Sequence, residues 1–184
     1  MKTSGNPRWF FHDKQRLLDF SKNKGLYIME LVNHNAREED EAWYVYDSNG
    51  EISIILNSTI VKKPSKSICA LLHELGHHED HMSREMVLRN AASEKLLDEL
   101  LAGVHGFIIY KELELEIPQR YYIRENNSNI RTYVEEVKNK FLQEDATKII
   151  SVAFTYFNMY VDYYYKNRDN AVEIPESLLR FSTK

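Results

Sequence analysis

The chain has little cysteine, no excess of positive charge and no long apolar run. Its one cysteine, Cys69, cannot form an internal disulfide, which excludes a secreted disulfide scaffold. A formal net charge of −4 gives no reason to expect nucleic-acid binding. No segment offers about 18 uninterrupted apolar residues, and Met1 to Phe11 lacks the apolar run of a signal peptide. We therefore expect a cytoplasmic protein that binds neither nucleic acid nor a membrane.

The composition is that of a folded protein. Apolar residues make up 43% of the 184 residues and charged residues 28%, as in ordinary globular domains. This length allows one domain with a real core, with or without a helical extension. We predict a main domain over 1–118 and a helical extension over 119–184 that packs on the same domain.

Periodicity and turn signals predict an α+β fold. The first part of the chain reads as a helix and three strands, over 13–22, 26–32, 42–46 and 51–56. Lys24-Gly25 ends the helix, and a polar loop is expected over 33–41. Asn49-Gly50 lies between the last two strands, which is a strong hairpin signal. We expect a small antiparallel sheet that packs on the helices that follow.

The rest of the chain reads as helical. Helices are expected over 65–82, 91–113, 130–142 and 146–166. Ser65 is the expected N-cap of the first of them. Pro118 stops the second, and the polar stretch 126–129 is predicted to break the chain between helices. Aromatic residues at helical spacing in 154–165 are expected to be core or subunit contacts. Apolar residues of the tail are expected to dock back on the domain: Leu178, Leu179 and Phe181.

A histidine motif lies on the first of these helices. Residues 71–78 read Leu-Leu-His-Glu-Leu-Gly-His-His and contain the pattern H-E-x-x-H. His73 and His77 are one helical turn apart, so their imidazoles point the same way and can bind one metal ion. Glu74 borders the same site and can hold a water bound to that ion. The pattern indicates metal-assisted hydrolysis with Glu74 as the base.

Two histidines leave a catalytic zinc one protein ligand short, because such sites have three protein ligands and one open position. His81 lies a further turn along the same helix, and a rise of about 5.4 Å per turn is too long for Zn–N bonds of about 2 Å. Glu79 and Asp80 meet the same objection. The next predicted helix offers three further carboxylates: Glu94, Asp98 and Glu99.

The pattern of small residues favours Glu99 among these. Gly76 is kept inside the motif helix although glycine costs about 1 kcal/mol there relative to alanine, which suggests that another chain segment passes close by. On the second helix Glu99 shares a face with small residues that would allow this close approach: Ala102, Gly103 and Gly106. The charged residues of that helix other than Glu94, Asp98 and Glu99 are expected to form a solvated face.

Glu99-Leu100-Leu101-Ala102 has the form E-x-x-A, and together with the H-E-L-G-H stretch it resembles the gluzincin class of zinc metallopeptidases. More narrowly, the chain is similar over about Leu26 to Pro118 to the ImmA/IrrE-type and related phage metallopeptidases. The resemblance implies one Zn²⁺ bound by His73, His77 and Glu99, with Glu74 as the general base. It also implies a protein or peptide substrate, such as a repressor.

Some features stay open at this point. A peptidase needs a donor that stabilises the oxyanion of its tetrahedral intermediate, and His105 or one of the tyrosines is the candidate. His78 and His81 are expected to lie at a solvated helix end. Cys69 is expected to be a small buried side chain. The alternative function is a non-catalytic zinc-binding protein of a phage or mobile element that acts through protein–protein interaction.

Overall fold

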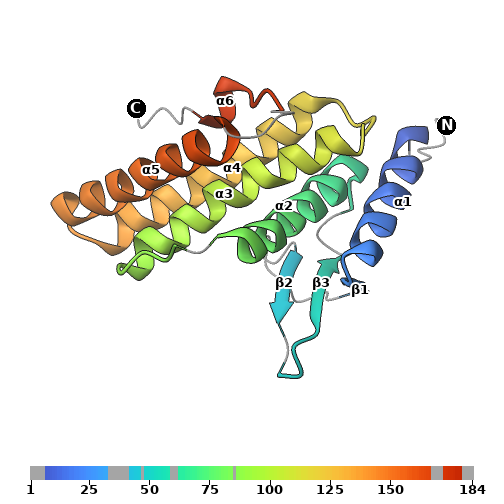
Figure 1. The fold of residues 1–184 in the computed structure, drawn as a ribbon, viewed down its shortest axis with the longest axis horizontal. Helices are drawn as coiled ribbons and strands as arrows, with labels where there is room; N and C mark the ends of the chain where they lie inside the picture. The colour runs from blue at the N-terminus through green and yellow to red at the C-terminus, as the bar shows by residue number, and fades with distance from the viewer. Residues whose placement is uncertain are drawn as a thin grey trace.

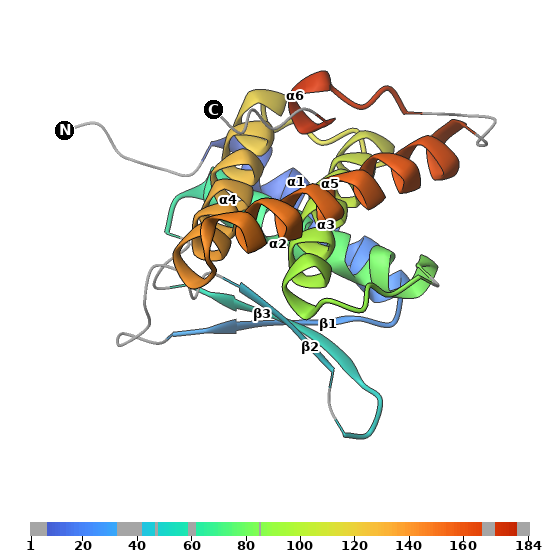
Figure 2. The same ribbon diagram turned by 90° about the vertical axis from the view of Figure 1, so that its left-hand side faces the viewer.

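The computed structural model describes residues 7–32, 42–46, 48–58, 62–84, 86–166 and 172–179. It confirms an α+β protein, in which a three-stranded sheet packs on one side of a group of helices (Figure 1). The sheet lies at one end of the molecule, and the long helices of the second half of the chain lie at the other (Figure 2). No helix among the described residues combines the length and the apolar character needed to cross a membrane.

The first helix, α1 (Arg8–Asn23), is longer than the predicted 13–22, and it ends where the sequence places its end. Gly25 has a φ of 74°, the left-handed conformation in which glycine commonly terminates a helix. The strand β1 (Tyr27–Leu31) follows directly. The predicted loop over 33–41 lies outside the described residues.

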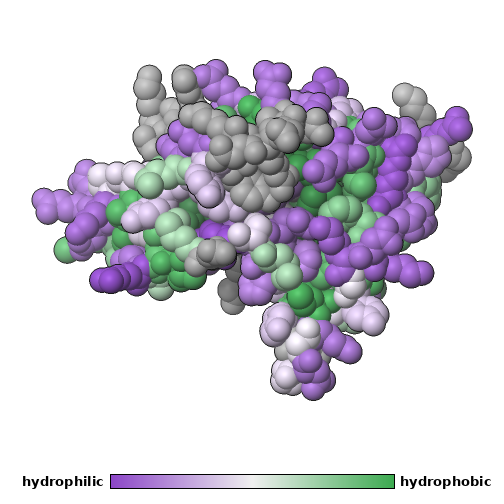
Figure 3. All heavy atoms as spheres, in the orientation of Figure 1, coloured by the Kyte–Doolittle hydropathy of each residue, from purple (hydrophilic) through white to green (hydrophobic). Residues whose placement is uncertain are grey.

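The predicted hairpin is confirmed by β2 (Ala42–Tyr46) and β3 (Ile52–Asn57), which pair antiparallel. Gly50 in the turn has a φ of 83°. The sheet as a whole is mixed rather than antiparallel, because β1 pairs parallel to β3 and the strand order is β1-β3-β2. This order leaves β2 at one edge of the sheet. The hairpin projects from the body, with hydrophobic residues at its base (Figure 3).

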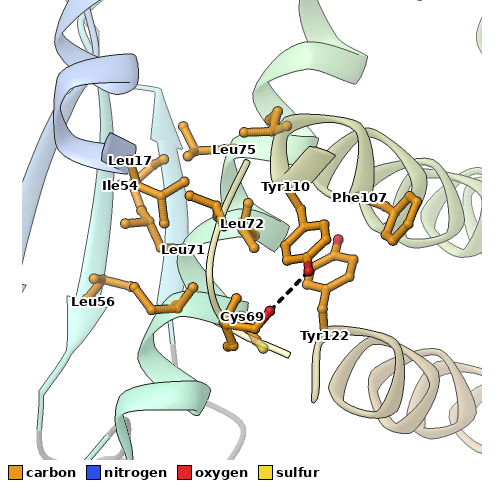
Figure 4. Packing of buried hydrophobic residues seen from close by; sticks show 14 of the residues in the cluster. Leu17, Ile54, Leu56, Cys69, Leu71, Leu72, Leu75, Phe107, Tyr110 and Tyr122 are labelled. Carbon is orange, nitrogen blue, oxygen red and sulfur yellow. Dashed lines mark hydrogen bonds between the residues drawn. The ribbon is translucent and has the colours of Figure 1, made fainter. Parts of the chain in front are cut away.

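The motif helix is α2 (Pro64–Ser83), and its apolar face covers the inner face of the sheet. Leu71 and Leu72 are buried and lie between the β3 residue Ile54 and the aromatic rings of later helices (Figure 4). The prediction that Ser65 caps this helix is wrong. The cap residue is Lys63 and the helix begins at Pro64, since a proline at the first position already has a helical φ and needs no N–H partner.

The second long helix, α3 (Ala91–Glu112), agrees with the predicted 91–113. Its N-cap is Asn90, whose side-chain oxygen accepts a hydrogen bond of 3.0 Å from the backbone N–H of Ser93. This helix packs against α2 along much of its length and against α5 on another side. It is buried on nearly every face in its second half, which places it at the centre of the helical layer.

The predicted break at 126–129 is wrong, because α4 (Gln119–Lys140) runs through it without interruption. Tyr122, Ile130 and Val134 of this helix are buried against its neighbours. The helical period of these apolar positions continues across the asparagines. Packing of that face outweighs the modest intrinsic preference of asparagine for turns.

The chain ends with α5 (Gln143–Lys166) and the short α6 (Glu176–Leu179). Phe157 of α5 is fully buried, and Tyr156 and Tyr160 pack against the same cluster, so these aromatic residues are core contacts as expected. Leu178 is buried, which confirms that the tail docks back on the domain. The predicted contact of Phe181 lies outside the described residues.

Candidate metal centre

The two motif histidines stand side by side on α2. The ring centroids of His73 and His77 are 4.7 Å apart, because residues one turn apart project from the same face of a helix. Both rings are partly accessible, with 12% and 20% of the side-chain surface exposed. Their Nε2 atoms point toward the same acidic residue of α3, Glu99.

Glycines allow α3 to bring Glu99 this close. A Cβ on Gly76 would lie 2.0 Å from the carbonyl oxygen of Ala102, and a Cβ on Gly106 would lie 2.5 Å from that of Leu72. Real Cβ atoms do not approach a backbone oxygen so closely, so α2 and α3 can touch only where side chains are absent. The predicted close passage at Gly76 is therefore confirmed, and it occurs one turn from Glu99 on α3.

The three side chains form a group that could hold a metal ion. Glu99 Oε2 lies 3.0 Å from His73 Nε2 and 3.7 Å from His77 Nε2, and the three donor atoms all lie within 4.8 Å of one another. Ligand atoms around a tetrahedral zinc stand roughly 3.3 Å apart, given Zn–N bonds of about 2.0–2.1 Å. The predicted ligand set fits this spacing with only small shifts.

The charges of the group suit a cation. Burial alone would lower the pKa of His77, but the hydrogen bond to Glu99 and the negative charges of Glu99 and Glu74 outweigh it and raise that pKa to about 9. Burial would raise the pKa of Glu99, but hydrogen bonds and charge from His73 and His77 lower it well below its usual range. Without a metal, a proton on His77 therefore balances the Glu99 carboxylate.

Glu74 lies beside this group in a different environment. Its side chain is almost entirely buried, and burial is the main reason that its pKa is raised. A backbone hydrogen bond from Tyr44 of β2 favours the ionised form and holds the carboxyl group against the sheet. The hydroxyl of the same tyrosine lies 3.1 Å from Nδ1 of His78. The edge strand thus fixes the motif helix at two points.

A cavity of about 990 Å³ opens over the group. Its walls come from α2, α3, α4 and the edge strand β2. The strand contributes Ala42, Trp43 and Tyr44, and the four residues Glu74, His73, His77 and Glu99 lie at the surface of the same cavity. The predicted ligands and the predicted base are thus brought together at one accessible place.

No protein-family model, curated protein or solved structure matches the chain.

The competing ligand candidates have other partners. Arg84, at the end of α2, forms ion pairs with Asp80, Glu94 and Asp98, at 3.1 Å for Asp80 and 2.8 Å for Glu94. These three carboxylates therefore surround the guanidinium of Arg84, whose side chain is only 9% exposed. Within the described residues, the metal-binding group includes neither Cys69, which is buried as expected, nor His81.

The structure differs from the predictions for two histidines, His78 and His105. His78 is buried, at 4% exposure, and contacts Tyr44 rather than solvent, whereas His81 is exposed as predicted. His105 lies on the side of α3 that faces α5, where its ring centroid is 6.1 Å from that of Tyr160. His105 is not among the residues that line the cavity, so the structure does not bring it to the predicted ligands.

The sequence did not lead us to predict that α4 forms one wall of the cavity. Asn129 Nδ2 lies 3.2 Å from His73 Nε2, and the Tyr133 hydroxyl is hydrogen-bonded to Glu99. Asn126 is buried in the same wall. These residues fell in or after the stretch that was predicted to be a break. The sequence did contain a signal for this wall. Tyr122, Ile130 and the residues between them follow the spacing of one continuous helix.

Proposed function

We propose that this protein is a zinc-dependent metallopeptidase that hydrolyses peptide bonds in a protein substrate. The observation that carries the proposal is the buried Glu74 carboxyl group, which lies at the surface of the same cavity as the His73, His77 and Glu99 group. A site with only a structural role has no use for a carboxyl group there. The resemblance to H-E-L-G-H metallopeptidases supports the same conclusion.

The donor set favours zinc. Two imidazole nitrogens and one carboxylate are the ligands of many catalytic zinc sites, and three protein ligands leave one position open. A bound zinc ion supplies a Lewis acid and lowers the pKa of its water to near 7. Neither Cys69 nor His81 belongs to the group of donors in the described residues, so neither of these two side chains fills the open position.

Glu74 moves the proton. Its carboxyl group lies at the surface of the same cavity as the three candidate ligands and can take the proton of the attacking water. The water oxygen bonds to the carbonyl carbon, and the same carboxyl group then gives that proton to the amine as the C–N bond breaks. The backbone contact with Tyr44 fixes the direction in which Glu74 points.

The position of β2 favours an extended peptide as the substrate. This strand has β3 as its neighbour on one side and lies at the edge of the sheet. Three of its residues line the cavity beside Glu74. An extended chain can pair with the edge of a sheet through backbone hydrogen bonds, which would hold it beside the metal-binding group.

The test compares three proteins: the wild type, Glu74→Gln and Glu79→Gln. Zinc content is measured first, and hydrolysis of an internally quenched peptide library is measured next. We expect Glu74→Gln to keep one zinc ion and to lose hydrolysis by about 10²–10⁴-fold, the usual effect of losing a general base. Glu79 lies on the same helix, pairs with Lys24 and does not line the cavity, so Glu79→Gln should remain active.

Two results would contradict the proposal. Equal hydrolysis by the wild type and Glu74→Gln would show that Glu74 is not the base. A wild-type protein that binds zinc but cleaves no peptide in the library, and no protein in a cell extract, would identify a zinc-binding protein without peptidase activity.

A further inference from the structure

The face of α4 that lines the cavity is held firmly by α3. The Tyr122 hydroxyl donates a hydrogen bond of 2.8 Å to the carbonyl oxygen of Gly103. A Cβ on Gly103 would lie 2.3 Å from the side-chain oxygen of Asn126, so that asparagine packs directly on the α3 backbone. Tyr122 and Asn126 share a helix face with Asn129 and Tyr133, because all four follow a spacing of three or four residues. The last two residues are therefore presented to the metal-binding group by a rigid support.

A bound metal would change the hydrogen bonding of Asn129. Its Nδ2 lies 3.2 Å from His73 Nε2, and Glu99 Oε2 lies 3.0 Å from the same nitrogen. One ring nitrogen cannot donate to the carboxylate and also accept from the amide. When His73 Nε2 gives its lone pair to a metal, the Asn129 amide loses this partner and is left beside the metal with its N–H groups available.

Asn129 and Glu74 reach the cavity from different helices, α4 and α2. The sheet, which holds Glu74 through Tyr44, and helix α4 lie on different sides of α2 in both ribbon views (Figures 1 and 2). Glu74 and Asn129 both line the cavity, so a peptide carbonyl bound there would have the base from α2 and the amide from α4 among its neighbours. Attack of water on the carbonyl carbon places negative charge on the carbonyl oxygen, which needs a hydrogen-bond donor that is already in place.

We propose that Asn129 is a catalytic residue, and that its side-chain amide donates a hydrogen bond to the carbonyl oxygen of the scissile peptide as that oxygen becomes negative. This inference rests on the proposed peptidase function. Tyr133 does not compete for the role, because its hydroxyl is hydrogen-bonded to Glu99. His105, the candidate from the sequence, does not line the cavity. In the reaction the water oxygen bonds to carbon, the C–N bond breaks, and the water proton passes through Glu74 to the amine.

The experiment uses Asn129→Ala, Asn129→Asp and the control Asn127→Ala in the full chain. Asn129→Asp keeps the shape and one oxygen but removes the N–H donor, which also tests the assignment of the amide nitrogen and oxygen. The Asn127 amide donates to the carbonyl oxygen of Ser177 and does not line the cavity. Thermal unfolding of each variant reports whether the helix remains folded.

Three quantities are measured: zinc affinity by competition with a chromophoric chelator, kcat and KM on the best library peptide, and binding of a phosphinic peptide of the same sequence. The phosphinic group resembles the tetrahedral intermediate. For Asn129→Ala and Asn129→Asp we expect kcat to fall by about 10²–10³-fold, the usual loss on removing one oxyanion donor. The phosphinic peptide should bind more weakly by a similar factor, since such analogues report transition-state contacts. For Asn129→Ala, KM and zinc affinity should change by less than about threefold.

The outcomes separate the two proposals. Activity of Asn129→Ala or of Asn129→Asp close to that of the wild type overturns the role of Asn129 while leaving the peptidase intact. Loss of zinc affinity in Asn129→Ala also overturns it, since the amide would then serve the metal and not the substrate. Absence of hydrolysis by the wild type, or full activity of Glu74→Gln, contradicts the peptidase itself.

Discussion

The Glu99 carboxylate turns two neighbouring imidazoles into a three-sided site. Its oxygen lies between the Nε2 atoms of His73 and His77, and its orientation depends on Tyr133. Burial, the charge of Glu99 and the hydrogen bond to Glu99 all raise the pKa of Tyr133, so the phenol keeps its proton and donates it. Lys95 Nζ lies 4.6 Å from the centre of the Tyr133 ring and helps to fix it.

Replacing Tyr133 with Phe should weaken zinc binding by about 10–100-fold, because loss of a group that orients a ligand typically has this effect. Competition with a chromophoric chelator measures the change. Tyr156→Phe is the matched control, since Tyr156 packs in the helical core and does not line the cavity. Equal zinc affinity in both variants would show that Tyr133 does not orient Glu99.

At the scale of elements, the site depends on the contact between α2 and α3. The two helices meet backbone to backbone at Gly76, where a side chain would collide with the carbonyl oxygen of Ala102. Glu99 lies three residues before Ala102 on α3. A change that separates the helices at this point must therefore also move Glu99, the candidate third ligand.

Gly76→Ala should lower the free energy of unfolding by about 1–3 kcal/mol or more, since overpacking a core typically costs this much. It should also weaken zinc binding. Gly103→Ala is the comparison, because its Cβ would meet the side chain of Asn126 and not backbone. Its loss of stability should be smaller. Urea unfolding without zinc measures stability, and the chelator assay measures affinity. Equal losses in the two variants would contradict this account of the contact.

At the scale of the whole molecule, the site joins elements that are distant in the chain. The candidate ligands His73 and Glu99 come from different helices, Glu74 is held by β2, and α4 forms one wall of the cavity. A metal that binds two helices at once binds the folded state only, so it must stabilise the whole fold.

Removal of metal with a chelator should therefore lower the melting temperature. At free zinc about 1,000 times the dissociation constant, binding contributes about 4.1 kcal/mol. Calorimetry with and without zinc measures the shift, and a His73→Ala, His77→Ala double variant should show none. A wild-type melting temperature that does not respond to zinc would show that the group does not bind the ion tightly.

The sequence by itself determined the features that depend on spacing within one element. The helical repeat places His73 and His77 on one face, Asn49-Gly50 makes the hairpin, and Gly25 ends α1. It also pointed to Glu99, because a glycine kept inside a helix signals the close approach of another. Such signals are local, and local geometry follows from the residue types alone.

Only the tertiary structure decided which groups meet across elements. It made β1 parallel to β3, turned His105 toward α5, and continued α4 through the asparagine-rich stretch so that Asn129 reaches His73. The physical reason is that asparagine in isolation favours turns, whereas burial of an apolar face against neighbouring helices stabilises a helix. That burial depends on neighbours far away in the chain, which periodicity within one segment does not reveal.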